Sequence, residues 1–160
     1  MRGKSAALLA AAGVAAVLVA ARRTLVVVNV SGASMEPTLH DGDRILVRRR
    51  RAEQVRRGEI TVLAAPEAAT APEWQCGTWH VKRVSALAGD PVPDGVPMPF
   101  PTDRVPVGSV VALGDNDEGG DSRTWGPYRS DGIVGTYLLR LRDRADPVRR
   151  PDPFRPRTRH

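Results

Sequence analysis

The feature that most constrains this chain is an uncharged, mostly apolar run of 17 residues, 5–21, with arginines at 22 and 23 directly behind it. A helix needs about 17 to 25 such residues to cross the hydrocarbon of a membrane. The run therefore predicts an uncleaved membrane anchor over residues 1–23, with the rest of the chain exported. The alternatives are a cleaved signal peptide, which the two arginines disfavour, and a buried Ala-rich helix, which the missing polar face disfavours.

Composition leaves room for one domain after the anchor. The chain has 160 residues, 24 Lys plus Arg against 18 Asp plus Glu, and a net charge of +6. A single cysteine, Cys76, excludes an intrachain disulfide framework and a cysteine-ligated zinc site, and three scattered histidines do not suggest a metal site. Only Lys4 and Lys82 are lysines, and lysine, unlike arginine, can lose its proton inside a protein.

Beyond residue 23 the sequence pattern is that of a mostly β domain, residues 24–142. Short runs rich in β-branched residues and bounded by turn signals predict strands at 24–30, 44–47, 60–64, 79–85, 109–113 and 133–141. No convincing helical stripe is present after residue 23. A segment with six prolines, 91–106, predicts an extended connector that stays out of the sheet interior.

The last residues, 143–160, form a tail with six arginines among four prolines, and this composition predicts disorder. The tail and the arginine run 48–51 offer positive charge to nucleic acid or to anionic lipid. Nucleic acid is not predicted, because the sequence has neither aromatic interleaving nor a recognisable nucleic-acid module. Membrane lipid is the predicted partner of an anchored chain, since each basic residue near the surface contributes about 1 kcal/mol.

Two of three chemically suggestive motifs lie on turns. The first is GASMEPTL at 32–39, where the Ser34 hydroxyl can project and its N–H can point outward to an anion. Most serines in such turns only close local hydrogen bonds. Another motif is GDNDEGGDSR at 114–123, followed by TWGP. Its carboxylates could ligate a metal, but the ligand spacing of an EF-hand is missing, so no metal is predicted.

The remaining motif, HVKRV at 80–84, lies on a predicted strand. Alternation places His80 and Lys82 on one face of the strand and Val81 and Arg83 on the other. If the Lys82 face is the core face, its ammonium must be paired or become neutral, because desolvation lowers the pKa of a lysine. The alternative is a surface lysine whose charged end reaches water.

Together the motifs resemble the type I signal peptidases, the membrane-bound serine/lysine proteases of peptidase family S26. That family has SMxPT, then GD with a hydrophobic strand, then KR followed by GD, then GDN and DSR with an aromatic-Gly-Pro. The corresponding segments are SMEPT at 34–38, GDRILV at 42–47, KR at 82–83 with GD at 89–90, GDN at 114–116 and DSRTWGP at 121–127. The resemblance covers residues 24 to about 140 and the anchor.

The resemblance implies a mainly β fold: a compact signal-peptidase/LexA-like β catalytic domain, 24–142, with one N-terminal transmembrane helix. It also implies a single-pass protein of the cytoplasmic membrane whose catalytic domain is extracytoplasmic. The expected activity is cleavage of signal peptides from exported preproteins after small residues, of the Ala-x-Ala type. Neither a cofactor nor a metal is implied.

Residue by residue, the resemblance makes Ser34 the nucleophile, with its backbone N–H donating to the oxyanion, and a neutral Lys82 the general base. A small apolar substrate pocket would be lined by Val30, Leu39 and Val81. Supporting residues carried over from the family are Asp115, Asn116, Asp121, Arg123 and Arg83. Among them Asp121 and Arg123 would hold the loop next to the lysine, with Arg83 reaching the acidic partner.

Departures from the family pattern are confined to three positions. Gly32 stands where some members have a serine that completes the oxyanion hole, which leaves the second donor unidentified. Gly119 stands where many members have a serine that orients the lysine, in a loop one residue shorter than the commonest form. A serine at 119 is therefore expected to raise the rate if the loop presents its hydroxyl. His80 replaces an aromatic residue and is interpreted as packing beside Lys82.

Two other classes of function stay open. A LexA-like self-cleaving repressor shares the serine/lysine pair, and the dipeptide 88–89 is Ala-Gly, its cleavage sequence. That dipeptide follows Lys82 instead of preceding Ser34, and the amino terminus shows an apolar run instead of a helix-turn-helix. A non-catalytic membrane scaffold of the same fold is favoured by Gly119 and disfavoured by the intact Ser34 and Lys82.

Overall fold

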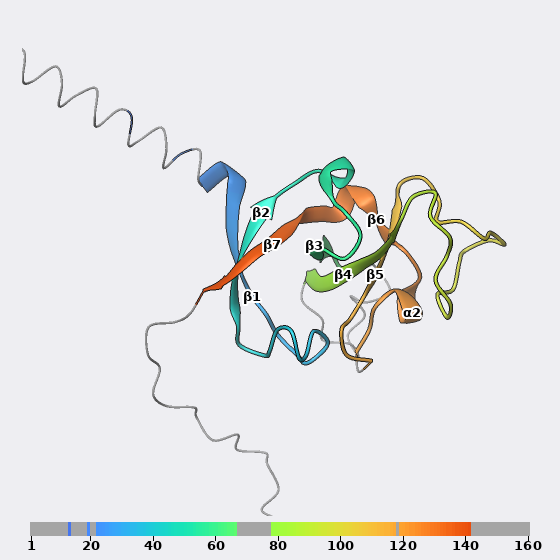
Figure 1. Ribbon diagram of the computed structural model, residues 1–160, viewed down its shortest axis with the longest axis horizontal. Helices are drawn as coiled ribbons and strands as arrows, with labels where there is room; N and C mark the ends of the chain where they lie inside the picture. The colour runs from blue at the N-terminus through green and yellow to red at the C-terminus, as the bar shows by residue number, and fades with distance from the viewer. Residues whose placement is uncertain (1–12, 14–18, 20–21, 67–77, 118, 142–160) are drawn as a thin grey trace, which may run out of the picture.

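The computed structural model describes residues 13, 19, 22–66, 78–117 and 119–141. The strands in these ranges form a single seven-stranded antiparallel sheet (Figure 1). The strand order across the sheet is β1-β2-β7-β3-β4-β5-β6. The strands are β1 (Leu25–Asn29), β2 (Arg44–Arg49), β3 (Ile60–Ala64), β4 (Trp79–Leu87), β5 (Ser109–Leu113), β6 (Tyr128–Arg129) and β7 (Ile133–Leu141). Short helical turns are η1 (Ala52–Gln54), α2 (Ser122–Trp125) and η4 (Ser130–Gly132).

The mainly β prediction is confirmed, and each of the six predicted strands matches an observed one with small differences at the ends. Sequence patterns missed β6 and α2 because two and four residues are too short to show a period. The predicted anchor, 1–23, and the predicted tail, 143–160, lie almost entirely outside the described residues. Within the described ranges, no helix has the length and apolarity needed to cross a membrane.

The sheet curls because its register shifts in three strand pairs. The irregularities lie at Leu46/Val47 between β2 and β7, at Val62/Leu63 between β3 and β7, and at Val84/Ala86 between β4 and β5. Such bulges bend a strand and increase its twist.

Three apolar clusters pack against this curled sheet, and they lie on both of its faces, since the consecutive β3 residues Val62 and Leu63 belong to different clusters. The first cluster joins β1, β2 and β3 to the loop after β1: Val28, Val30, Met35, Leu39, Ile45, Val47, Ile60 and Val62. The second cluster includes β5 and β6: Val55, Leu63, Val84, Val110, Ala112 and Tyr128. The third cluster lies under the proline-rich connector: Ala86, Val96, Val105 and Val111. Loops thus take part in the core, which fixes their position relative to the strands.

The connector 91–106 stays out of the sheet, as predicted, but it folds back on itself instead of being extended, since the Val92 N–H donates to the Asp103 carbonyl over 2.9 Å. Its one ladder contact is an isolated bridge between Pro91 and Arg104, and it buries Val96 and Val105 in the third cluster. In Figure 1 the connector, in yellow-green, projects from the side of the sheet opposite β1.

Candidate active site

Ser34 lies in the loop between β1 and β2, residues 30–43, and burial fixes this loop from inside. Met35 and Leu39 are each 1% exposed and pack in the first apolar cluster. The Leu39 N–H donates to the Met35 carbonyl over 2.9 Å, which closes a turn. The SMEPT motif therefore anchors itself through its methionine and presents the adjacent, half-buried serine on a turn.

A second segment, residues 114–116 after β5, holds the serine turn from the other side. The Asn116 N–H donates to the Ser34 carbonyl over 3.1 Å, and the Asn116 amide donates to the Ala33 carbonyl over 3.3 Å. The backbones approach so closely that a Cβ at Gly114 would lie 2.5 Å from the Ser34 carbonyl oxygen. Because two backbones meet there, the position accepts glycine alone, and the GDN and SMEPT motifs form one unit.

Asp115 ties the serine loop to β4. Its carboxylate accepts from the Thr38 hydroxyl over 2.6 Å and from the Arg83 guanidinium over 2.8 and 2.6 Å. The Arg83 bond, supported by Thr38, lowers the pKa of Asp115 against the opposing effect of burial. The same bond raises the pKa of Arg83. The acidic partner of Arg83 is thus Asp115, in a bidentate pair that links three chain segments.

Asp121 organises the turn that precedes α2. The carboxylate is 1% exposed and accepts from the N–H groups of Arg123 and Gly114, each over 2.8 Å, and from the Arg123 guanidinium over 2.6 Å. Burial alone would raise the pKa of Asp121, but the bonds from Arg123 and Gly114 outweigh it and lower the pKa. Arg123 also pairs with Asp117. The DSR motif therefore fixes the segment that holds Ser34.

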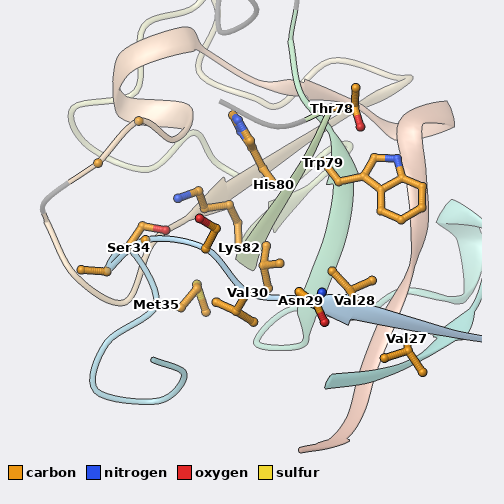
Figure 2. A pocket seen from close by; sticks show the side chains of 16 residues that line it. Val27, Val28, Asn29, Val30, Ser34, Met35, Thr78, Trp79, His80 and Lys82 are labelled. Carbon is orange, nitrogen blue, oxygen red and sulfur yellow. The ribbon is translucent and has the colours of Figure 1, made fainter. Parts of the chain in front are cut away.

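Lys82 reaches the same place from β4. The alternation of β4 turns His80 and Lys82 to a buried face, where they are 8% and 4% exposed, so of the two alternatives for Lys82 the structure has the buried one. Lys82 and Ser34 line one cavity of about 550 Å³, and Figure 2 shows both side chains pointing into it. Residues 119–120, which also line the cavity, are glycines. A hydroxyl and a buried amine that share a cavity are the groups that a serine/lysine protease uses.

His80 lies beside Lys82 on the cavity wall and is held by Tyr128 of β6. The His80 Nδ1 lies 2.9 Å from the Tyr128 hydroxyl, and the two rings meet edge to face at 5.8 Å between centroids. Burial, and then the positive charge of Lys82, lowers the pKa of His80 to about 4. The imidazole is therefore neutral at neutral pH. Sequence reasoning missed Tyr128, because the bond joins residues 48 apart.

The three residues expected to form the substrate pocket divide into two groups. Val30 and Val81 line the cavity with Ser34 and Lys82. Leu39 is not among the lining residues and instead belongs to the first apolar cluster. Sequence spacing cannot separate these cases, since it does not show on which side of the loop a buried side chain packs.

Gly119 differs from what the resemblance suggests. Its φ of +119° is one that residues with side chains rarely adopt, and a Cβ there would lie 3.1 Å from the Ser34 Cβ. A serine at this position would therefore press against Ser34 as well as strain the backbone. We accordingly expect Gly119→Ser to slow the reaction, contrary to the expectation from the family pattern.

Comparison with known proteins agrees with this geometry. The family model for signal peptidase, peptidase S26, matches residues 4–93, which include Ser34 and Lys82. A protein named probable signal peptidase I-1 from Synechocystis sp. is 33% identical over 132 residues, covering 68% of this chain and 66% of the relative. The chain thus spans just under two thirds of the length of that relative.

Proposed function

This chain belongs to the signal peptidase family, peptidase S26, and we propose that it is a serine endopeptidase that removes signal peptides from exported preproteins. One observation carries the proposal: the Ser34 hydroxyl and the buried Lys82 amine line the same cavity. The scissile bond would follow a small residue, with another small residue two positions earlier.

In the proposed reaction the Ser34 Oγ attacks the scissile carbonyl carbon while Lys82 takes the hydroxyl proton. The tetrahedral intermediate collapses, the C–N bond breaks, and Lys82 passes its proton to the leaving amine. Water then attacks the acyl-enzyme with Lys82 again as base, which releases the signal peptide acid and restores Ser34. Burial of Lys82 supports this role, because an apolar setting favours the neutral amine that a base requires.

The oxyanion of the intermediate needs fixed donors, and the Ser34 N–H is the one we propose. Loss of one such donor in serine proteases costs a few kcal/mol, about 2.7 to 4. The Gly32 N–H is committed elsewhere, since it donates to Asp41 Oδ1 over 2.8 Å. Asn116 supports the proposal, because its side-chain amide donates to the Ala33 carbonyl over 3.3 Å and so holds the peptide plane that carries the Ser34 N–H.

A preference for small residues is proposed from the cavity walls. Val30 and Val81 are β-branched and stiff, so the pocket between them and Ser34 cannot widen by a rotamer change. A methyl group such as that of alanine suits such a site better than a long or aromatic side chain. Leu39 and the other members of the first apolar cluster support Val30 from inside.

We also propose that the domain rests on a membrane surface through the outer face of β1, β2 and β7. Val27, Leu46 and Leu139 are direct neighbours in the ladder, and Val27 and Leu139 are 44% and 46% exposed. Arg44 and Arg48 lie on the same face, two positions either side of Leu46. An apolar row between basic side chains suits an anionic lipid surface.

The proposed location is the cytoplasmic membrane, with residues 1–23 as a single span and residues 24–142 outside as the catalytic domain. Protease added to intact cells should then degrade the domain. Protection of the domain in intact cells, with degradation only after lysis, would contradict this topology.

Cleavage of a preprotein with an Ala-x-Ala site tests the activity. Wild type should cut after the second alanine, and Ser34→Ala and Lys82→Arg should each lose essentially all cleavage while keeping the fold. Arginine keeps the charge of lysine but cannot act as a base, so Lys82→Arg separates electrostatics from proton transfer. Ser85→Ala, on the other face of β4, is the matched control and should cleave normally.

Other outcomes of this assay favour the other classes of function. Cleavage by Ser34→Ala at the wild-type rate would favour a scaffold that copurifies with a protease. Self-cleavage between Ala88 and Gly89 would favour a LexA-like protein. The Gly89 N–H donates to the Val105 carbonyl over 2.8 Å, so that dipeptide is held within the connector region.

A further inference from the structure

His80 is a buried titratable residue that the proposed reaction does not use. It lines the cavity next to Lys82, with 8% of its surface exposed. Its Nε2 is buried and has no hydrogen-bond partner among the described residues. A buried polar atom without a partner is costly, so such an atom in the wall of a reactive cavity suggests a function during the reaction.

The His80 ring has a fixed orientation. One edge is held by the hydrogen bond between Nδ1 and the Tyr128 hydroxyl, and the edge-to-face contact of the rings has an interplanar angle of 76°. A neutral imidazole has one donor nitrogen and one acceptor nitrogen. If Nδ1 donates to the Tyr128 hydroxyl, Nε2 is the acceptor, and if Nδ1 accepts, Nε2 is the donor. Because Tyr128 of β6 holds the ring, the direction in which Nε2 points is fixed.

Lys82 is the charged residue beside His80 on the wall of this cavity. The two residues alternate on the same face of β4, and the charge of Lys82 is felt at the imidazole, since it lowers the pKa of His80. Residues 119–120 also line the cavity, and as glycines they offer no side chain. Thr61 also neighbours Lys82 across β3 and β4, but its hydroxyl donates to the Glu59 carbonyl over 3.5 Å.

We propose that His80, held by Tyr128, is a positioning residue whose Nε2, which has no hydrogen-bond partner among the described residues, bonds to the Lys82 amine during the reaction and directs it toward Ser34. The inference rests on the proposed function, because it takes Lys82 to be the general base. A lysine has four rotatable bonds, and a fixed neighbour removes the arrangements in which the amine points away from Ser34. His80 itself neither gains nor loses a proton in the reaction.

Kinetics of preprotein cleavage test this role with three variants. His80→Phe keeps a ring but removes Nε2, and kcat should fall about tenfold while KM stays within twofold. The pH at which kcat reaches half its maximum should move down, because loss of a polar neighbour disfavours the ammonium. His80→Gln returns a polar group, and it should recover at least half of the decrease in log kcat that His80→Phe causes. Tyr128→Phe should give a smaller loss than His80→Phe.

Thr61→Val is the matched control, since it removes the other polar group beside Lys82 and keeps the side-chain shape. It should leave kcat and the pH profile unchanged. Unchanged kcat and pH profile in His80→Phe would overturn the inference, as would a larger effect in Thr61→Val. If His80→Phe does not fold, His80→Gln and Tyr128→Phe decide: wild-type kcat and pH profile in both would also overturn it.

A second readout does not depend on activity. Nuclear magnetic resonance should show the His80 imidazole titrating with a pKa of about 4, and Lys82→Met should raise that pKa by removing the neighbouring charge. An unchanged His80 pKa in Lys82→Met would overturn the pairing. The two proposals fail in different ways. If Lys82→Arg still cleaves the preprotein, the proposed mechanism is wrong. If Lys82→Arg is inactive but His80→Phe has normal kinetics, only the positioning role of His80 is wrong.

Discussion

Two irregular segments of this molecule, the serine loop 30–43 and the connector 91–106, are held in opposite ways. The serine loop is held by side chains and backbone from elsewhere in the chain: Asn116, Asp115 and Arg140, whose guanidinium donates to the Thr38 carbonyl over 2.5 Å. The connector is closed mainly by bonds within residues 89–105. In Figure 1 the serine loop lies near the segment that leads to α2, whereas the connector projects away from the sheet.

The difference shows where precision is needed. The position of a nucleophile relative to its base must be held to within a fraction of an ångström, so the serine loop is fixed to β7 and to the segment between β5 and α2. A connector that only joins two strands needs no such fixing. Substitutions at contacts of the serine loop should therefore reduce activity, and equivalent substitutions in the connector should not.

The largest expected effect comes from the backbone contact at Gly114. In Gly114→Ala the added Cβ would meet the Ser34 carbonyl oxygen at 2.5 Å, which pushes the serine turn away from Lys82. Preprotein cleavage should fall at least about 100-fold, since a displacement near 1 Å costs that much. Gly95→Ala in the connector is the control: its φ of +76° strains an alanine locally, but that Cβ meets nothing within 4 Å, so cleavage should stay normal. Comparable losses in both variants would contradict the comparison.

The next effect concerns the side-chain bonds of the serine loop. Asp115→Asn removes the charge that pairs with Arg83, and we expect cleavage to fall about tenfold and the free energy of unfolding by about 1 kcal/mol. Because the folded pKa of Asp115 is below 3.8, the carboxylate stabilises above that pH and the difference from the variant should shrink as pH falls further.

The exposed pair Arg129–Asp131 is the control for this experiment. Asp131→Asn removes a similar ion pair far from the serine loop in sequence, and neither stability nor cleavage should change measurably. If Asp131→Asn lost as much activity as Asp115→Asn, the loss would come from the change in the net charge of the protein and not from a weaker attachment of the serine loop.

A smaller effect is expected at Gly119. Gly119→Ala and Gly119→Ser both place a Cβ 3.1 Å from the Ser34 Cβ at a φ of +119°, and each should slow cleavage several-fold. The pair separates strain from hydrogen bonding, because only serine brings a hydroxyl. A Gly119→Ser protein faster than wild type would contradict the strain argument and would show that its hydroxyl assists Lys82.

The smallest effect is expected in the connector. Phe100 is 54% exposed and Val107, just beyond the connector, is 95% exposed. Phe100→Ser and Val107→Ser should leave cleavage within twofold of wild type and the melting temperature almost unchanged. A large loss of activity in either variant, with the fold intact, would show that the connector takes part in substrate binding.

Much of the fold was predictable from short-range patterns, and much of the site was not. The β-branched run 60–64 and the alternation of 79–85 predict strands because the residue types in each segment match the burial of its side chains in the sheet. The inward position of Lys82 follows from the same alternation. Contacts such as Thr38 with Asp115, 77 residues apart, depend on which strands become neighbours, and no local pattern encodes that order. The packing of Leu39 and the conformation at Gly119 likewise depend on the assembled sheet.

The pH dependence of cleavage tests the central claim, a neutral Lys82 acting as base on Ser34, most directly. The rate with a preprotein substrate should be measured from neutral to alkaline pH, with the fold checked at each point by circular dichroism. The account predicts a rate that rises with pH by up to tenfold per unit as one group loses its proton, then levels off. The same measurement on Lys82→Arg should show no such rise and almost no rate. A flat wild-type profile with the protein folded throughout would contradict the claim.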